Sequence, residues 1–486
     1  MSADLPPYPE YKDSGVPWLG DVPKHWAVLP NRAIFTEVND RDHPDEQMLS
    51  VTITAGVIPQ RALLTDSSKK DSSNQDKSAY KLVRPGDIAY NKMRAWQGAL
   101  GVSDYHGIVS PAYVVERPRE GADPRYLHYL LRTPAFAKEA ERWSYGITSD
   151  MWSLRPEHFR VIYGCLPPLP EQTAIVRFLD HKDRRIRRYI AAKKKLISLL
   201  NEQKQAIIQH GVTRGLDPAV RLKPSGVEWL GDVPEHWDIR RIRTCVESVT
   251  AGLWGEDPSG ANSADHIVCV RVADFDMDHL VVNHRRLTTR ALPLSARESR
   301  RLGPGDLLIE KSGGGDAEPV GRVVRFSLLE PAVCSNFVVR LRPLPIVRSD
   351  FLLFVLTLLQ STRRNIPSIK QTTGIQNLDL RHYFATSMAV PPLGEQDAIL
   401  AKVDASMTTV GRAQEQARFE VELIREYRTR LIADVVTGKH DVRDVAAQWP
   451  EEVEEPAPLD GADALAGGDQ SDDEAAAEAV SVEVAG

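Results

Sequence analysis

The residues that come nearest to a catalytic pattern are two carboxylates and a lysine in the second half of the chain. Asp306 is followed by Glu310 and Lys311, and carboxylates of this kind can hold the metal ions that nucleases use to cleave phosphodiesters. The spacing is tight, however. A similar segment in the first half begins at Asp87 and has Asn91 at the position of the second carboxylate. We therefore reject a nuclease site.

Other catalytic and metal-binding patterns are also missing from the sequence. HExxH, GxSxG and GxGxxG do not occur, and Lys311 precedes the glycines 313–315 instead of following them as in a phosphate-binding loop. His25 and His236 are expected to be packed, hydrogen-bonded residues. The cysteines are too far apart to indicate a zinc cluster or a disulfide framework; they are Cys165, Cys245, Cys269 and Cys334. The sequence thus predicts a protein that is not an enzyme.

One thirteen-residue motif occurs twice. Residues 14–26 read SGVPWLGDVPKHW and residues 225–237 read SGVEWLGDVPEHW, identical at eleven positions and 211 residues apart. Such a dense match indicates an internal duplication. The four tryptophans of this WLGD motif are expected to be packing residues; they are Trp18, Trp26, Trp229 and Trp237.

Further segments recur in the same order, at distances that grow only to 224 residues. The pairs are 84–87 with 303–306, 113–115 with 337–339, 167–172 with 391–396, and 212–213 with 436–437. This period is far longer than the roughly 20 to 50 residues of solenoid repeats. The chain therefore contains two whole repeats, each a globular domain followed by a long segment.

Charge is distributed unevenly along the chain. Residues 444–486 hold thirteen acidic and no basic residues, so the net charge of −6 leaves +7 for residues 1–443. The composition predicts a disordered acidic tail, which serves solubility or else mimics or competes with DNA. No signal peptide and no apolar run near the roughly 18 residues of a membrane span are present, and we expect a cytoplasmic protein.

Each long segment begins at a PPL-EQ boundary, PPLPEQ at 167–172 and PPLGEQ at 391–396. Proline suits the start of a helix, and Glu171 and Glu395 favour its N-terminus electrostatically. Apolar residues then recur every three or four positions, which predicts two long helices that pair as an antiparallel coiled coil. The residues expected at the coiled-coil and subunit interface are Ile175, Leu179, Ile186, Ile190, Leu200 and Ile207, and Ile399, Val403, Val410, Ala417, Val421, Ile424 and Leu431.

The domains, 27–166 and 238–390, alternate short apolar runs with polar turns, and helical runs follow at 126–136 and 351–359. This pattern is typical of mixed α/β units. Their loops carry basic and amide side chains, which bind phosphates and read base edges, although most such clusters are solvated surface. The DNA-binding candidates are Lys69, Lys70, Lys92, Arg94, Trp96, Arg285, Arg286, Lys311, Ser312, Lys370, Gln371 and Thr372.

The WLGD motifs, the PGD strands followed by lysine and the PPL-EQ boundaries together resemble the specificity subunit of Type I restriction-modification enzymes, over about residues 9–443. The resemblance implies an α+β fold in which two mixed α/β target recognition domains are separated by a long antiparallel two-helix coiled coil, with pseudo-twofold internal duplication. Each domain would read one half of a bipartite DNA site.

The resemblance also implies a division of the chain into segments. These are 1–26, the first WLGD motif; 27–170, target recognition domain 1; 171–220, spacer helix 1; 221–237, the second motif; 238–394, target recognition domain 2; 395–443, spacer helix 2; and 444–486, the acidic tail. Four residues added to one helix would shift one reader by about 6 Å, or about two base pairs.

The expected partners are double-stranded DNA, two modification (methyltransferase) subunits and restriction subunits, with no membrane contact. The resemblance implies no cofactor in this chain, and S-adenosylmethionine, ATP and Mg on the partner subunits. It does not explain the basic cluster Lys182, Arg184, Arg185, Arg187 and Arg188, which is either a solvated helix face or a docking surface for an acidic partner. The alternative function is a non-catalytic coiled-coil adaptor that binds proteins instead of DNA.

Overall fold

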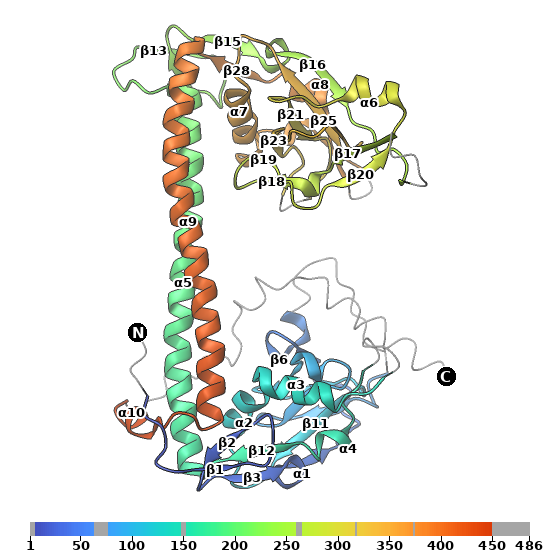
Figure 1. Cartoon of the computed structure of the whole chain (residues 1–486), viewed down its shortest axis with the longest axis vertical. Coiled ribbons are helices and arrows are strands. Elements are labelled where there is room, and N and C mark those ends of the chain that lie inside the picture. The colour runs from blue at the N-terminus through green and yellow to red at the C-terminus, as the bar shows by residue number, and fades with distance from the viewer. Residues whose placement is uncertain are drawn as a thin grey trace. The chain divides into compact units, whose positions relative to one another are not determined.

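The computed structural model (Figure 1) describes residues 5–62, 76–146, 152–258, 265–315, 318–372 and 375–449. The chain divides into two compact units, Met1–Ala192 with Glu420–Gly486, and Lys193–Phe419. Two long helices, α5 (Leu169–Arg214) and α9 (Leu393–Val436), contribute to both units. Each unit therefore contains one sheet domain and a part of each helix. No helix in the described ranges is long and apolar enough to cross a membrane.

Both long helices begin at the PPL-EQ boundaries, as predicted. Glu171 and Glu395 are the third residues of α5 and α9, where a negative charge stabilises the helix N-terminus. Both helices end at a glycine in the left-handed conformation, Gly215 (φ +73°) and Gly438 (φ +81°), which lets the chain turn away. Both glycines lie against a tryptophan of a WLGD motif, Gly215 against Trp237 and Gly438 against Trp26.

In the first unit, the two helices pair in antiparallel orientation. Arg428 of α9 forms an ion pair with Asp183 of α5. Tyr189, further along α5, donates a hydrogen bond of 2.7 Å to Glu420, which lies earlier on α9. The partner positions thus move in opposite directions along the two helices.

The second unit shows the same antiparallel pairing. The Gln414 amide donates a hydrogen bond of 2.6 Å to the side-chain oxygen of Asn201. Further along α5, Gly211 lies against Ile399 and Val403 near the start of α9. The absence of a side chain at Gly211 allows this close approach, because a Cβ there would lie 3.2 Å from both of these side chains.

The helix residues predicted to lie at the interface fall into two groups. Nine are buried: Ile175, Leu179, Ile186, Ile399, Val403, Val410, Ala417, Val421 and Leu431. Four are half-buried: Ile190, Leu200, Ile207 and Ile424. Beside Ile207, it is Ile208 that is buried. Ile207 itself packs, partly buried, against the core of the second unit.

The sheet domain of the first unit is built from antiparallel strands. Its main sheet has the order β4-β11-β8-β9 and packs against three short helices. The strands are β4 (Phe35–Val38), β8 (Ile88–Asn91), β9 (Leu100–Val102) and β11 (Tyr113–Pro118), with smaller pairs β1 (Tyr11–Asp13) with β2 (Asp21–Pro23), β3 (Ala27–Pro30) with β12 (Tyr163–Leu166), β5 (Leu49–Thr52) with β6 (Gly56–Pro59), and β7 (Lys81–Val83) with β10 (Gly107–Val109). α1 (Asn31–Ile34) joins β3 to β4.

The helical run predicted at 126–136 is two helices. α2 (Pro124–Leu131) ends before Thr133, whose hydroxyl accepts a hydrogen bond from the Phe136 backbone N–H and caps α3 (Pro134–Arg142). The single-helix prediction was wrong because Pro134 cannot continue a helix and instead begins a new one. A third helix, α4 (Pro156–Phe159), precedes β12.

The sheet domain of the second unit is larger. Its main sheet has the order β16-β25-β21-β23-β19-β18. The strands are β16 (Val246–Ala251), β18 (Phe275–Asp276), β19 (Val281–Val282), β21 (Leu307–Glu310), β23 (Val323–Arg325) and β25 (Val338–Pro343); smaller sheets are β13 (Leu222–Pro224) with β14 (Asp232–Pro234), β15 (Asp238–Arg241) with β28 (Ser387–Val390), β20 (Thr288–Ala291)-β17 (His266–Val270)-β24 (Ala332–Cys334), and β22 (Ser312–Gly313)-β27 (Ile375–Leu378)-β26 (Ile369–Thr372). The helices are α6 (Leu294–Arg300), α7 (Ser349–Ser361) and α8 (Leu380–Tyr383).

The apolar core of each domain continues into the two long helices. In the first unit the core includes Phe178 and Leu179 of α5 and Val435 of α9. In the second unit it includes Val212 of α5 and Val403 of α9. Burial of these side chains, at about 25 cal/mol per Å² of apolar surface, fixes each domain to its own segment of the helix pair.

Candidate nucleic-acid interface

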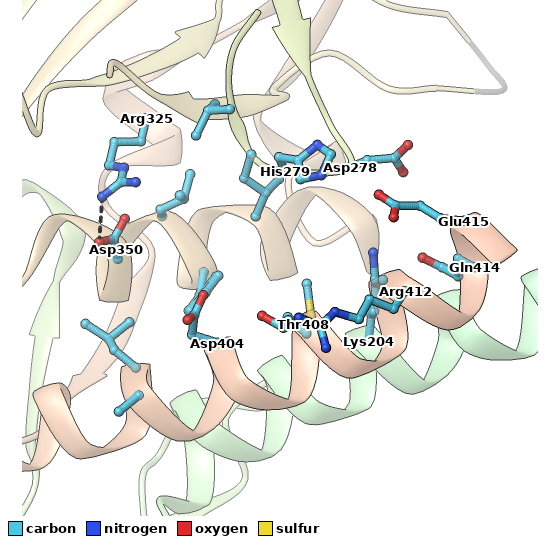
Figure 2. Close-up of a pocket in the computed structure, with 18 of the residues that line it drawn as sticks. Lys204, Asp278, His279, Arg325, Asp350, Asp404, Thr408, Arg412, Gln414 and Glu415 are labelled. Carbon is cyan, nitrogen blue, oxygen red and sulfur yellow. Dashed lines mark hydrogen bonds and ion pairs between the residues drawn. The ribbon is translucent and has the colours of Figure 1, made fainter. Parts of the chain in front are cut away.

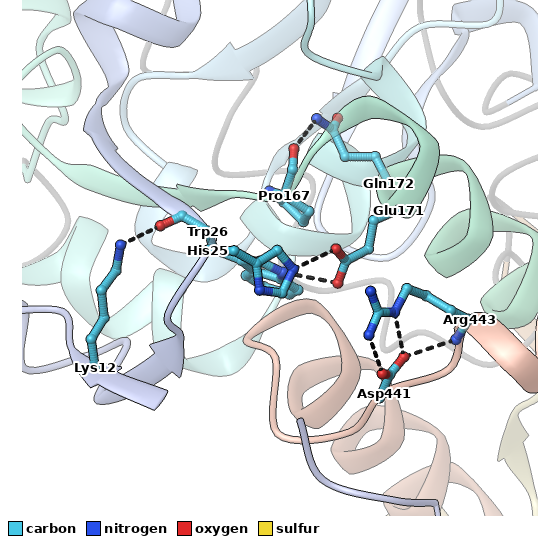
Figure 3. A network of polar contacts seen from close by, with 8 residues as sticks. All are labelled: Lys12, His25, Trp26, Pro167, Glu171, Gln172, Asp441 and Arg443. Atoms are coloured by element: carbon cyan, nitrogen blue, oxygen red, sulfur yellow. Dashed lines mark hydrogen bonds and ion pairs between the residues drawn. The ribbon is translucent and has the colours of Figure 1, made fainter. Parts of the chain in front are cut away.

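The first unit contains a polar network that joins the WLGD motif to the start of α5 (Figure 3). One carboxylate oxygen of Glu171 accepts a hydrogen bond of 2.9 Å from the Trp26 indole N–H, and the other lies 2.8 Å from His25 Nε2. Gln172 accepts from the Asp123 backbone N–H at 2.7 Å and donates to the Pro167 carbonyl at 2.7 Å. We call Glu171 and Gln172, with the groups they bind, the first EQ clamp.

The second unit repeats this arrangement as the second EQ clamp. Glu395 lies 2.7 Å from His236 Nε2. Gln396 accepts from the Arg348 backbone N–H and donates to the Pro391 carbonyl, at 2.7 and 2.8 Å. Both histidines are hydrogen-bonded, as expected from the sequence. One contact differs, because the buried indole N–H of Trp237 has no hydrogen-bond partner among the described residues.

The PGD aspartates form a second repeated feature of the two domains. Asp87 accepts two hydrogen bonds, of 2.7 and 2.9 Å, from the Arg117 guanidinium. Asp306 accepts two bonds of 2.9 Å from Arg342. In both cases the hydrogen bond to the aspartate raises the pKa of the arginine. These buried aspartates hold strands together.

The remaining carboxylate of the rejected nuclease pattern has a similar structural partner. Glu310 is buried and accepts hydrogen bonds of 3.0 and 3.1 Å from Arg322. Both carboxylates of that pattern are therefore bound by arginines. Within the described ranges, no group of three or more His, Cys, Asp or Glu side chains is placed to hold a metal ion.

One small sheet of the second unit brings several DNA-binding candidates together. Across its three strands, Ser312 of β22 lies opposite Asn377 of β27, and Asn377 lies opposite Lys370 of β26. The Ser312 hydroxyl is 2.6 Å from the Asn377 side-chain oxygen. Gln371 is next to Lys370 and is exposed. The antiparallel pair β26-β27 forms a two-stranded ribbon. A ribbon that carries cationic and amide side chains has the size and chemistry to enter the major groove.

In the first domain, the described residues Tyr145, Ser153 and Leu154 lie at the corresponding place. The Leu154 backbone N–H donates to the Lys92 carbonyl at 2.9 Å, as Leu378 donates to Lys311 at 2.8 Å, and Tyr145 pairs with Ser153 in an antiparallel bridge. The β26-β27 hairpin thus has a counterpart beside Lys92. Sequence reasoning missed this segment, although the repeat distance of 224 residues maps it onto 369–378.

The other candidates are placed less favourably or lie outside the description. Lys69 and Lys70 are outside the described residues, and of Thr372 only the backbone, in β26, is described. The Trp96 indole N–H donates to the Met93 carbonyl, and the ring packs on Trp152. Lys92, Arg94 and Lys311 are half-buried, and Arg285 and Arg286 are exposed after β19. Lys370 forms an ion pair of 2.7 Å with Asp379.

A cavity of about 670 Å³ lies in the second unit between the sheet domain and α9 (Figure 2). Its lining includes the apolar residues Phe354 and Met407 and charges of both signs, among them Asp404 and an Arg325–Asp350 ion pair of 3.1 Å. Such mixed charges do not define one class of ligand. The two repeats differ here in the contact between the domain and the long helix.

In the first unit the corresponding elements, α2 and α5, are linked by polar contacts. Tyr129 of α2 donates to Asp180 of α5 at 2.6 Å, and Arg125 forms an ion pair of 3.1 Å with the same carboxylate. Asp180 is nine residues after Glu171, and Asp404 is nine residues after Glu395. Tyr129 is six residues after Asp123, whose backbone N–H binds Gln172, and Phe354 is six residues after Arg348, whose backbone N–H binds Gln396. Asp404 therefore corresponds to Asp180, and Phe354 to Tyr129. Because phenylalanine has no hydroxyl, this link between domain and helix is missing in the second unit.

A buried carboxyl group in the first domain lacks any hydrogen-bond partner. Both oxygens of Glu116, on β11, are unpaired among the described residues, and Glu116 lies opposite Glu37 of β4. Burial, together with the charge of Glu37, raises the pKa of Glu116 to about 7, although Arg160 opposes this effect. The folded domain therefore favours the protonated form of Glu116 near neutral pH.

The chain is similar in sequence to two curated proteins, and no family model matches it. It is 26% identical over 220 residues to the Type I restriction enzyme EcoKI specificity subunit of Escherichia coli K12, covering 43% of this chain and 44% of that protein. It is 23% identical over 236 residues to the putative type I restriction enzyme MjaX specificity subunit of Methanocaldococcus jannaschii, covering 46% of this chain and 52% of that protein. The matches thus span about half the length of these curated relatives.

Among solved structures, the chain is similar to one from a study of complex assembly and conformational transition of the type I R-M system. The TM-score is 0.62 at 18% identity, covering 86% of this chain and 99% of the other. At that identity the likeness shows a shared fold. An HsdS subunit from Thermoanaerobacter tengcongensis superposes with a TM-score of 0.44 at 17% identity. The resemblance inferred from the sequence motifs is thus confirmed: in sequence this chain resembles the specificity subunits of Type I restriction enzymes, and its fold is one found in a Type I restriction-modification complex.

Proposed function

We propose that the chain is the DNA sequence-specificity subunit of a Type I restriction-modification complex. Each sheet domain reads one half of a bipartite target, and the paired helices set the distance between the halves and dock two modification subunits. Chemistry belongs to the partners. The modification subunits bind S-adenosylmethionine and methylate adenine, and the restriction subunits use ATP and Mg²⁺ to translocate and cut DNA.

The observation that carries this proposal is the contrast between the clamps and the hairpins. Apart from the Trp26 bond, the EQ clamps repeat with matching partners and distances that agree within 0.2 Å. Leu154 and Leu378 form equivalent backbone hydrogen bonds to Lys92 and Lys311, yet the sequences 145–154 and 369–378 share almost no residues. A protein that recognises two different DNA half-sites needs the same supporting structure in both domains and a different polar surface on each.

The competing function is a protein-binding coiled-coil adaptor, and the salt dependence of DNA binding separates the two. We expect the complex with its modification subunits to bind duplex DNA with an affinity that falls by roughly 10³ or more between 50 and 200 mM salt, since several phosphates are neutralised. Replacing Lys370 and Gln371 by alanine should weaken binding to one half of the target. An affinity that does not change with salt would favour the adaptor.

Exchange of one domain tests the division of labour. If residues 27–166 are replaced by those of a relative with another target, only one half of the methylated sequence should change. The matched exchange of residues 238–390 should change the other half. A change of both halves by either exchange would contradict the assignment of one domain to each half.

The spacer role of the helices is tested by a paired insertion. Seven residues added to α5 after Ala192 and seven to α9 after Phe419 preserve the phase of the coiled-coil repeat. They lengthen the helix pair by about 10 Å, equivalent to about three base pairs. Methylation mapping should then show a longer unread gap between two unchanged words, and an unchanged gap would refute the spacer role.

A further inference from the structure

The C-terminal end of the described chain packs against α5. After α9 the chain forms α10 (Arg443–Ala447), and the ring of Trp449 stacks on His181 with 4.0 Å between ring centroids and 14° between planes. Trp449 also stacks on Phe178. The Lys182 ammonium lies 6.0 Å from the centre of the Trp449 ring. The last described residue, Trp449, therefore lies beside Lys182.

This part of α5 carries cations without ion-pair partners, because its two acids, Asp180 and Asp183, pair with Arg125, Arg187 and Arg428. None of Lys182, Arg184, Arg185 and Arg188 forms an ion pair with any residue in the described ranges. Arg185 and Arg188 are exposed, and Lys182 and Arg184 are half-buried. Positions 181, 184, 185 and 188 share one helix face because they are three, four and seven residues apart. Burial, and then the charges of Arg184, Arg185 and Lys182, lower the pKa of His181.

The residues that follow Trp449 have the opposite charge. Residues 451–460 read EEVEEPAPLD, with five acidic and no basic residues. Arg188 is seven residues beyond His181, or about 10 Å along the helix. Glu455 is six residues beyond Trp449, and an extended chain of that length reaches about 20 Å. The acidic segment can therefore reach every cation of this helix face from the point where it leaves Trp449.

We propose that the acidic segment 451–460 docks on the basic face of α5 formed by Lys182, Arg184, Arg185 and Arg188. Trp449 holds the start of the segment, so its carboxylates meet these cations at high local concentration. The segment covers the face and competes with any acidic partner or nucleic-acid backbone that approaches it. This inference does not depend on the proposed DNA-reading function.

Zero-length crosslinking of the full chain tests the docking directly. A carbodiimide joins a lysine amine to a carboxylate only when the two are in contact, and mass spectrometry identifies the linked peptides. We expect a link from Lys182 to carboxylates within 451–455 whose yield is independent of protein concentration. The yield should fall several-fold at high salt, because exposed ion pairs are screened.

Matched variants separate specific docking from random collision. Neutralising Arg184, Arg185 and Arg188 to glutamine retains Lys182 but should reduce the yield by roughly fivefold, since the attracting charges are lost. The control Lys194→Gln with Lys195→Gln should leave it unchanged. In the tail, glutamine at Glu451, Glu452, Glu454 and Glu455 should abolish the link, whereas neutralising Asp472, Asp473, Glu474 and Glu478 should not.

Three outcomes would overturn the proposal. The first is that Lys182 links to no tail carboxylate. The second is that it links as often to 472–478 as to 451–455, which would indicate a tail that samples the surface at random. The third is that the yield is unaffected by the arginine substitutions.

Discussion

The two EQ clamps differ in one hydrogen bond, and this difference predicts different costs for the same substitution. Glu171 is 5% exposed and binds both Trp26 and His25. Glu395 is 28% exposed and binds only His236. Alanine at position 171 therefore leaves a buried indole N–H unpaired, while alanine at position 395 leaves no buried donor newly unpaired, because the Trp237 N–H has no partner at the outset.

The expected magnitudes follow from these contacts. A hydrogen bond to a charged group contributes about 1.5 to 3 kcal/mol, and an unpaired buried donor costs a similar amount. The bond from the half-exposed His25 contributes less because water competes for it. We expect Glu171→Ala to lower the free energy of unfolding of the first unit by about 3 kcal/mol, and Glu395→Ala to lower that of the second by about 1 kcal/mol.

Hydrogen exchange under native conditions measures the two units separately in the full chain. Peptides from β3, β12 and the start of α5 report on the first unit, and peptides from β15, β28 and the start of α9 report on the second. Glu171→Gln is the matched control, since its amide oxygen can still accept from Trp26. It should cost less than Glu171→Ala. Equal or larger destabilisation by Glu395→Ala would refute the role assigned to the Trp26 bond.

Two further predictions concern the interior of the domains. The pKa of Glu116 is raised from 4.5 to about 7, which corresponds to about 3 kcal/mol. Because the folded state favours the protonated acid, wild type should lose stability relative to Glu116→Gln as pH rises from about 4.5 to about 7, and urea unfolding across this range measures the difference. Tyr129→Phe should destabilise the first unit by about 1 to 2 kcal/mol through loss of the Asp180 bond. Phe354→Tyr, whose hydroxyl would face the cavity beside Asp404, should change the stability of the second unit by less than about 0.5 kcal/mol or raise it; local hydrogen exchange measures both.

Two results would contradict these predictions. If the stability difference between Glu116→Gln and wild type did not change with pH, Glu116 would not be the buried acid that the fold indicates. If Tyr129→Phe and Phe354→Tyr had equal effects, the Tyr129–Asp180 bond would not be the difference between the two units that the contacts indicate.

The features that were predicted correctly depend on local sequence. The long helices follow from apolar spacing and from proline and glutamate at their start, both of which can be recognised within one turn. The antiparallel pairing follows from the duplication. The break at Pro134 is also predictable from the sequence, because proline can begin a helix but cannot continue one.

The parts of the candidate site that were missed depend on contacts between distant residues. Arg117 and Arg342 are ordinary surface residues until the fold brings them to Asp87 and Asp306. Leu154 and Leu378 occupy equivalent positions through backbone hydrogen bonds to Lys92 and Lys311, which leave no pattern in the side chains. Readers of different DNA words must also differ in sequence, so internal similarity is weakest where recognition is proposed.

The central claim is that this chain directs adenine methylation to a bipartite DNA sequence. Single-molecule sequencing of host DNA, with and without the gene, tests it most directly. The account predicts a methyladenine motif of two short words separated by a fixed unread gap, present only with the gene. Methylation that does not change when the gene is removed, or a motif without a gap, would contradict it.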